Sequence, residues 1–220
     1  MSLHAVANQA FREGPNALQR LAAHPAGRQL ITAYIISRGG PRQSEGATPD
    51  KKLIDAWLDA VEAAQVKNIE NADRLAWTAY HAGRYDLAQR WLDRSPAEAP
   101  MAQWITAKLL MRKGKLNEAA DLLAKVARAF PADETWDDLN FSPDGTFWFY
   151  SFSPADQARA EIGALHLARA QYAEALDALL KADYWMDAAY IAERVLSPEE
   201  LTGYVNKNFP HDAKIAPPAS

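Results

Sequence analysis

Apolar residues recur at three- and four-residue steps through most of the chain, and two-residue alternation is nearly absent. Before residue 38, this pattern predicts short helices over 3–13, 15–23 and 27–37. A longer helix is predicted from residue 51 to 65, because its apolar side chains share one helical face, namely Leu53, Ile54, Trp57, Leu58 and Val61. The pattern as a whole predicts an all-α fold.

Glycine and proline divide the chain into parts. Residues 1–38 are predicted to be N-terminal helices, and 39–50 form a Gly/Pro-rich linker loop. A helical-repeat domain is expected over 51–209, with an aromatic insertion at about 134–155. The tail at 210–220 is expected to be disordered.

Two further helices are expected before that tail. One runs from Tyr184 to Val195, and the next begins after Ser197 and extends to about Asn206. Ser197 and Glu200 have the spacing of a capping box, in which each side chain bonds the other residue's backbone.

One sequence phrase occurs three times, over 82–88, 113–119 and 169–175. In each copy a small residue permits a tight turn, and a large apolar residue and an alanine then open a second helix. The alanine allows the partner helix to approach closely. Each phrase therefore predicts a hairpin of two antiparallel helices.

These hairpins resemble tetratricopeptide repeats over about half of the chain. The first interval between turn glycines is 31 residues, against the family's usual 34. The second interval, from Gly114 to the equivalent Ala170, is 56 residues, which is about 22 more than the family's usual length. The positions that match the family pattern are Leu75, Ala76, Gly83, Tyr85, Ala88, Leu92 and Pro100, then Ala107, Gly114, Leu116, Ala119, Leu123 and Pro131, and finally Gly163, Tyr172, Ala175, Leu179 and Ala182.

The resemblance implies a right-handed superhelix of helical hairpins, an α-solenoid, whose first helices line a concave groove. The run from Asp187 to Leu196 is also similar to a segment of longer bacterial helical-repeat proteins of unknown function. If that similarity holds, the chain would be one domain of a larger protein. We expect a cytoplasmic location by default, and the periplasm or cell envelope if the chain is such a domain.

When the family's groove positions are mapped onto this chain, those of the first two repeats are mainly aromatic and basic. Lys108 and Arg112 stand one helical turn apart, where they could meet an acidic group of a peptide or partner helix. Trp77 and Trp104 could instead be ordinary core residues. The carboxylate clamp of asparagine and lysine found in some family members is not reproduced. The expected peptide-binding residues are Asp73, Trp77, Tyr80, His81, Trp104, Lys108 and Arg112.

The insertion is rich in aromatic residues, with six between Phe141 and Phe152 around a turn at 142–145. These rings could form a binding surface or a lid over the groove. Alternatively, the insertion is an irregular connector whose rings fill the gap between two repeats. If both groove tryptophans are buried and the insertion fills the groove, the chain is better described as a scaffold segment.

Composition and charge narrow the function classes. The 220 residues include no cysteine, which excludes disulfides and thiol chemistry, and the net charge of −4 disfavours a broadly basic nucleic-acid surface. No apolar stretch has the length of a membrane span. No metal-binding, cofactor-binding or catalytic motif is found, so we expect neither metal nor cofactor.

Two function classes remain. The first is a non-catalytic scaffold or protein-interaction module that binds a protein or peptide, with self-association possible. The second is a helical regulatory or accessory domain of a bacterial envelope enzyme, such as one that cleaves peptidoglycan. A cleft lined by Asp137, Asp138 and His166 would favour catalysis within this chain, and an open groove around Trp77 and Lys108 would favour binding.

Overall fold

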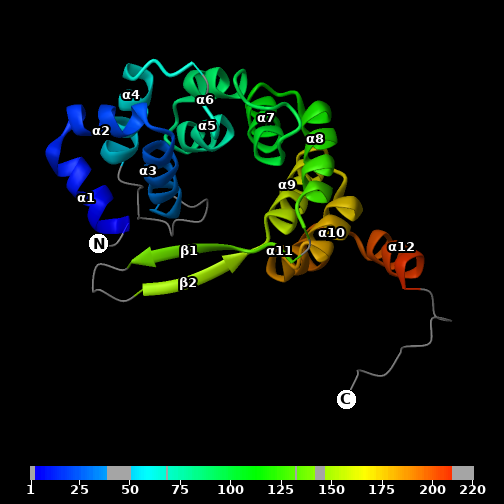
Figure 1. Ribbon diagram of the computed structural model, residues 1–220. Helices are drawn as coiled ribbons and strands as arrows, with labels where there is room; N and C mark the ends of the chain where they lie inside the picture. The colour runs from blue at the N-terminus through cyan, green and yellow to red at the C-terminus, as the bar shows by residue number, and fades with distance from the viewer. Residues whose placement is uncertain (1–2, 39–50, 68, 132, 142–146, 210–220) are drawn as a thin grey trace. The chain divides into compact units, whose positions relative to one another are not determined.

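The computed structural model describes residues 3–38, 51–67, 69–131, 133–141 and 147–209. Most of these residues are helical, which confirms the expectation of a predominantly helical chain (Figure 1). The linker at 39–50 and the tail at 210–220 lie outside the described residues. In chain order, the elements are α1 Leu3–Glu13, α2 Pro15–Ala23, α3 Pro25–Arg38, α4 Lys51–Ala63, α5 Ala72–His81, α6 Tyr85–Leu92, α7 Pro100–Arg112, α8 Leu116–Ala129, β1 Trp136–Phe141, β2 Phe147–Phe152, α9 Pro154–Ala168, α10 Tyr172–Lys181, α11 Trp185–Tyr190, the π-helix η1 Ile191–Val195 and α12 Pro198–Asn208.

The described chain falls into two compact units, Met1–Pro154 and Ala155–Ser220. This boundary lies at the end of the predicted insertion and not at the predicted linker over 39–50. The N-terminal helices belong to the first unit, where α2 packs on α4 and α3 packs on α5. α3 begins at Pro25, two residues earlier than expected, because proline is well suited to the first position of a helix.

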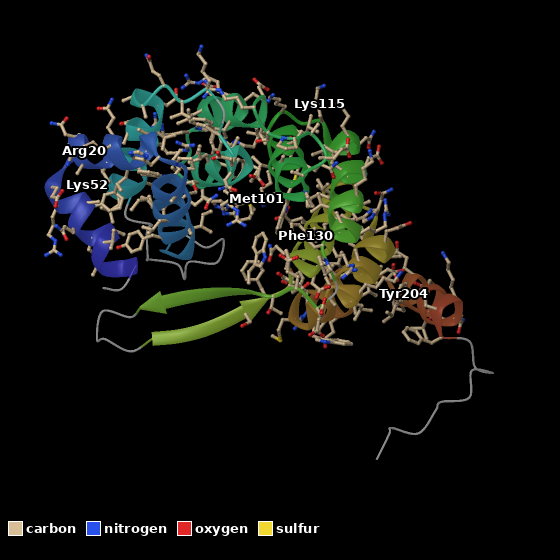
Figure 2. All side chains as sticks on the ribbon, viewed as in Figure 1. Arg20, Lys52, Met101, Lys115, Phe130 and Tyr204 are labelled. Carbon is tan, nitrogen blue, oxygen red and sulfur yellow. The ribbon has the colours of Figure 1, made fainter. Side chains whose placement is uncertain are left out.

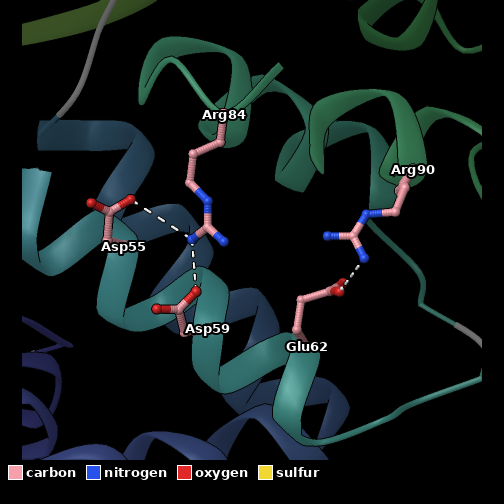
Figure 3. Close-up of polar contacts among 5 residues, drawn as sticks. All are labelled: Asp55, Asp59, Glu62, Arg84 and Arg90. Atoms are coloured by element: carbon pink, nitrogen blue, oxygen red, sulfur yellow. Dashed lines mark hydrogen bonds and ion pairs between the residues drawn. The ribbon is translucent and has the colours of Figure 1, made fainter. Parts of the chain in front are cut away.

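Ion pairs connect α4 to Arg84, which precedes α6, and to Arg90 within α6 (Figure 3). The Arg84 guanidinium lies 2.7 Å from an Asp59 oxygen and 3.7 Å from an Asp55 oxygen. One turn further along α4, Glu62 pairs with Arg90 at 3.0 Å. These pairs add charged contacts at the surface between α4 and the hairpin of α5 and α6.

Four interhelical turns share one backbone geometry. Gly83, Gly114, Ala170 and Asp183 all have positive φ, of 76°, 74°, 57° and 60°. In each turn the next residue donates its N–H to a carbonyl five residues earlier, over 2.9 to 3.0 Å, as in the Schellman motif that ends many helices. Three of these turns are the predicted phrases. The fourth, between α10 and α11, was not predicted, since an aspartate occupies the turn position.

The insertion is an antiparallel β-hairpin and not an irregular connector. β1 and β2 pair in register from Trp136 opposite Phe152 to Phe141 opposite Phe147, and β1 lies beside α3 (Figure 1). Aromatic residues favour strands, and the expected turn at 142–145 falls between the two strands, outside the described residues. This hairpin corrects the prediction that every element would be helical.

The second unit has its own core between α9, α10, α11, η1 and α12. Gly163 lets α9 and α10 approach closely, since a Cβ added there would lie 2.8 Å from Cγ of Leu179. Tyr204 of α12, labelled in Figure 2, donates a hydrogen bond to Asp177 of α10 over 3.3 Å. The predicted capping box is confirmed, because the Ser197 and Glu200 side chains each accept a backbone N–H of the other residue.

Candidate functional site

Eight rings form a continuous aromatic cluster in the first unit. Trp77 lies at its centre, with ring centroids 4.5 Å from His81, 5.2 Å from Trp104 and 6.0 Å from Trp136. The cluster draws on α5, α6, α7, the residue that follows α8 and the base of the hairpin, and that residue, Phe130, is labelled in Figure 2. Its members are Trp77, Tyr80, His81, Tyr85, Trp104, Phe130, Trp136 and Phe152.

Both predicted groove tryptophans are core residues. Trp77 is 2% exposed and Trp104 is completely buried. Trp136 packs on both tryptophans and on Phe130, and its Nε1 donates to Glu134 over 2.7 Å. The structure therefore does not place Trp77 or Trp104 on an open groove surface, because Trp136 at the base of the hairpin covers them.

The insertion thus fills space at its base. Phe152 is buried and lies 5.9 Å from the Trp136 ring, so the two residues that pair at the open end of the hairpin both contribute to the core. This agrees with the gap-filling interpretation for that end. The side chains of residues 137–150, which carry most of the insertion's aromatic rings, lie outside the described residues.

Four of the remaining predicted residues lie at the cluster or its edge. Tyr80, His81 and Lys108 are partly buried, and Arg112 is exposed. Asp73 is also partly buried, but no described contact joins it to the cluster. Nζ of Lys108 lies 5.9 Å from the Tyr80 ring centre and 5.7 Å from that of Trp104. The structure therefore brings Tyr80, His81 and Lys108 together with the tryptophans.

Arg112 is held by a ring that the sequence analysis assigned only to packing. Its guanidinium carbon lies 3.7 Å from the centre of the Tyr85 ring, and Tyr85 in turn contacts Tyr80 at 5.3 Å. No carboxylate pairs with Arg112 among the residues whose side chains are described. We call Tyr80, Tyr85, Lys108 and Arg112 the cationic edge. Tyr85 was missed as a site residue, although it opens α6, which packs on α7.

His81 is uncharged at neutral pH. Burial, together with the nearby charge of Lys108, lowers the pKa of His81 from 6.5 to about 4. Its Nε2 is buried and has no hydrogen-bond partner among the described residues. A neutral ring without a partner at this nitrogen fits a packing role against Trp77 and Tyr80, so positive charge at the rim is carried by Lys108 and Arg112.

Elsewhere the described residues offer little that could react or bind a metal. No group of three or more His, Asp or Glu side chains gathers as a metal site in the parts described. His166 shares a hydrogen bond with Gln171 over 2.9 Å, and the side chains of Asp137 and Asp138 lie outside the described residues. No described helix has the length and apolar character required to cross a bilayer.

A hollow of about 420 Å³ lies between the end of α4 and Arg94, which follows α6, and it is lined mainly by polar side chains. Glu62, which already pairs with Arg90, and Arg94, which stacks on Trp91 at 4.7 Å, both belong to its wall. Glu62 and Arg94 therefore already have partners in the fold, and Lys67, the third charged residue of the lining, is exposed.

Comparison with known proteins provides no assignment, since no family model, curated protein or solved structure matches the chain significantly.

Proposed function

We propose that this chain is a non-catalytic, tetratricopeptide-like interaction module, a right-handed stack of helical hairpins that binds an acidic peptide at its cationic edge. The observation that carries the proposal is the exposed Arg112, stacked on Tyr85 and without a carboxylate partner among the described side chains. A guanidinium held flat on a ring keeps donors around its perimeter, where they can bind a carboxylate in a bidentate manner.

The four turns of matching geometry support the repeat assignment. Ala88 and Ala119 are completely buried where the second helix of each hairpin meets its partner, the role that the repeat pattern gives these alanines. The buried tryptophans reduce the expected binding surface. Trp77 and Trp104 are buried and support the cluster from within. Tyr80, Lys108 and Arg112 are therefore the residues that would contact a ligand.

The test is a peptide selection against the full chain. A phage-displayed library of random peptides is selected on the immobilised protein, and enriched peptides are measured by fluorescence anisotropy with the wild type. We expect enrichment of acidic residues beside an apolar one. Arg112→Gln should weaken these peptides about ten- to a hundredfold, the range for loss of a hydrogen bond to a charged group.

Lys113→Gln is the matched control, because Lys113 is exposed, adjacent and also basic. Lys113→Gln should leave the affinity within about twofold, because no ring among the described residues orients the Lys113 side chain. Selection of peptides without acidic residues would contradict the proposal, as would equal affinities for the wild type and Arg112→Gln.

A further inference from the structure

A second surface, on α11, exposes three large apolar side chains side by side. Trp185 is 62% exposed, Met186 86% and Tyr190 64%, whereas Ala188 and Ile191 on the opposite side are buried in the core of the second unit. Most large apolar side chains of the described residues are buried, so three exposed ones on one short helix indicate an interaction surface. We call Trp185, Met186, Ala189 and Tyr190 the α11 face.

The shape of the α11 face suits another helix. Met186, Ala189 and Tyr190 are spaced i, i+3 and i+4, and Trp185 precedes Ala189 by one turn. Ala189 is itself exposed, so it forms a low point among three larger side chains. A side chain of a partner helix could enter this low point, as a knob enters a hole in helix packing.

The surroundings of the α11 face are acidic. Asp183 precedes the helix, Asp187 lies within it and Glu193 follows in η1, and all three are exposed. The Asp183 carboxylate accepts a hydrogen bond from Nε1 of Trp185, so its charge is held beside the indole. Between residues 182 and 196, Arg194 is the one basic residue, and Lys181 pairs with Asp177 at 2.7 Å.

The charge of the whole unit points in the same direction. Residues 155–220 contain ten Asp or Glu and six Lys or Arg, so the chain's entire formal net charge of −4 belongs to this unit. Two copies of the α11 face would bring acid against acid, which disfavours a symmetric pair. A partner with lysine or arginine beside its apolar stripe would have complementary charge.

We infer that the α11 face is a docking surface for a basic amphipathic helix of a partner protein. The partner's apolar stripe covers Trp185, Met186 and Tyr190, and its flanking cations meet Asp183, Asp187 and Glu193. This inference does not rest on the cationic edge, which lies in the other unit and has the opposite charge.

The probe is a labelled helical peptide of about 18 residues, five helical turns, with leucine at the i, i+3, i+4 and i+7 spacing and lysine elsewhere. Its acidic counterpart replaces each lysine by glutamate. Binding to the full chain is followed by fluorescence anisotropy at two salt concentrations. We expect the basic peptide to bind at least about tenfold more tightly than the acidic one, and to weaken as salt rises.

Variants connect that binding to the α11 face. Met186→Ser with Tyr190→Ser should weaken the basic peptide at least about tenfold, because central apolar contacts carry most of the affinity of an interface. Asp187→Lys should weaken it about fivefold and reduce its salt dependence. Leu167→Ser is the control, since Leu167 is an exposed apolar residue of the same unit, on α9, and it should have no effect.

Each remaining outcome overturns the inference. It fails if the basic peptide does not bind, if it binds the double variant as tightly as the wild type, or if the acidic peptide binds equally well. It also fails if sedimentation shows a dimer of the wild type that the double variant loses, because a second copy would then occupy the α11 face. Arg112→Gln should leave this binding unchanged, so failure here is distinct from failure at the cationic edge.

Discussion

The backbone at the four turns constrains which residues can occupy them. Gly83 and Gly114 stand at positive φ with open space where a Cβ would lie, so only conformational strain opposes a larger residue there. Ala170 occupies the same conformation and already bears that strain. An L-residue in this region is disfavoured by about 1–2 kcal/mol, and replacing glycine recovers about 0.4–1 kcal/mol from the unfolded chain.

We therefore expect opposite effects from reciprocal substitutions. Gly114→Ala should lower the free energy of unfolding by about 1 kcal/mol, and Ala170→Gly should raise it by up to about 1 kcal/mol. Urea unfolding followed by circular dichroism measures both. If Ala170→Gly lowered the free energy of unfolding instead, the backbone at Ala170 would not be strained.

His81 should make the stability depend on pH. Its pKa of about 4 in the folded chain lies below the ordinary 6.5, so between these values the unfolded state binds the additional proton. The contribution of His81 is complete above pH 6.5 and is lost as pH falls toward 4. From pH 7 to 4.5 the loss from this residue should be about 2 kcal/mol.

His81→Phe isolates that contribution, because every other group titrates in both proteins. The variant keeps a ring against Trp77 and removes the unpartnered Nε2. Its free energy of unfolding should decline less between pH 7 and 4.5 than that of the wild type. Parallel pH profiles would show that His81 can be protonated in the folded chain at little cost.

At the scale of elements, the sequence predicts helices well where an apolar stripe and end residues agree. α12 is the clearest case, since Ser197, Pro198 and Glu200 determine its start through local bonds alone. The turns at Gly83 and Gly114 were also predictable from local sequence, because glycine favours the positive φ that these turns require. The turn at Asp183 was not, because only the fold reveals the positive φ of an aspartate.

The hairpin and the groove show where local pattern is insufficient. β2 contains consecutive aromatic residues rather than an alternation, so the strand period is absent although aromatic composition favours a strand. The burial of Trp77 and Trp104 depends on Trp136, which is distant in sequence. Lys108 and Arg112 could be identified from their spacing in the sequence. The contact of Arg112 with the Tyr85 ring could not, because it depends on how α6 packs beside α7.

At the scale of the whole molecule, the chain has two units with separate cores and different charge. Leu123 is completely buried in the first unit and Leu176 is 3% exposed in the second. Truncating either side chain to alanine removes contacts within one core and leaves a cavity there. The expected cost is about 2–5 kcal/mol for each substitution.

Native-state hydrogen exchange can show which unit loses stability in each variant. With Leu176→Ala, amides in α9, α10 and α12 should exchange faster, and those in α5 to α8 should keep their protection, since each core belongs to its own unit. Leu123→Ala should give the reverse pattern. Faster exchange throughout the chain with either substitution would mean that the two units unfold as one cooperative body, and the α11 face would then depend on the stability of the first unit as well.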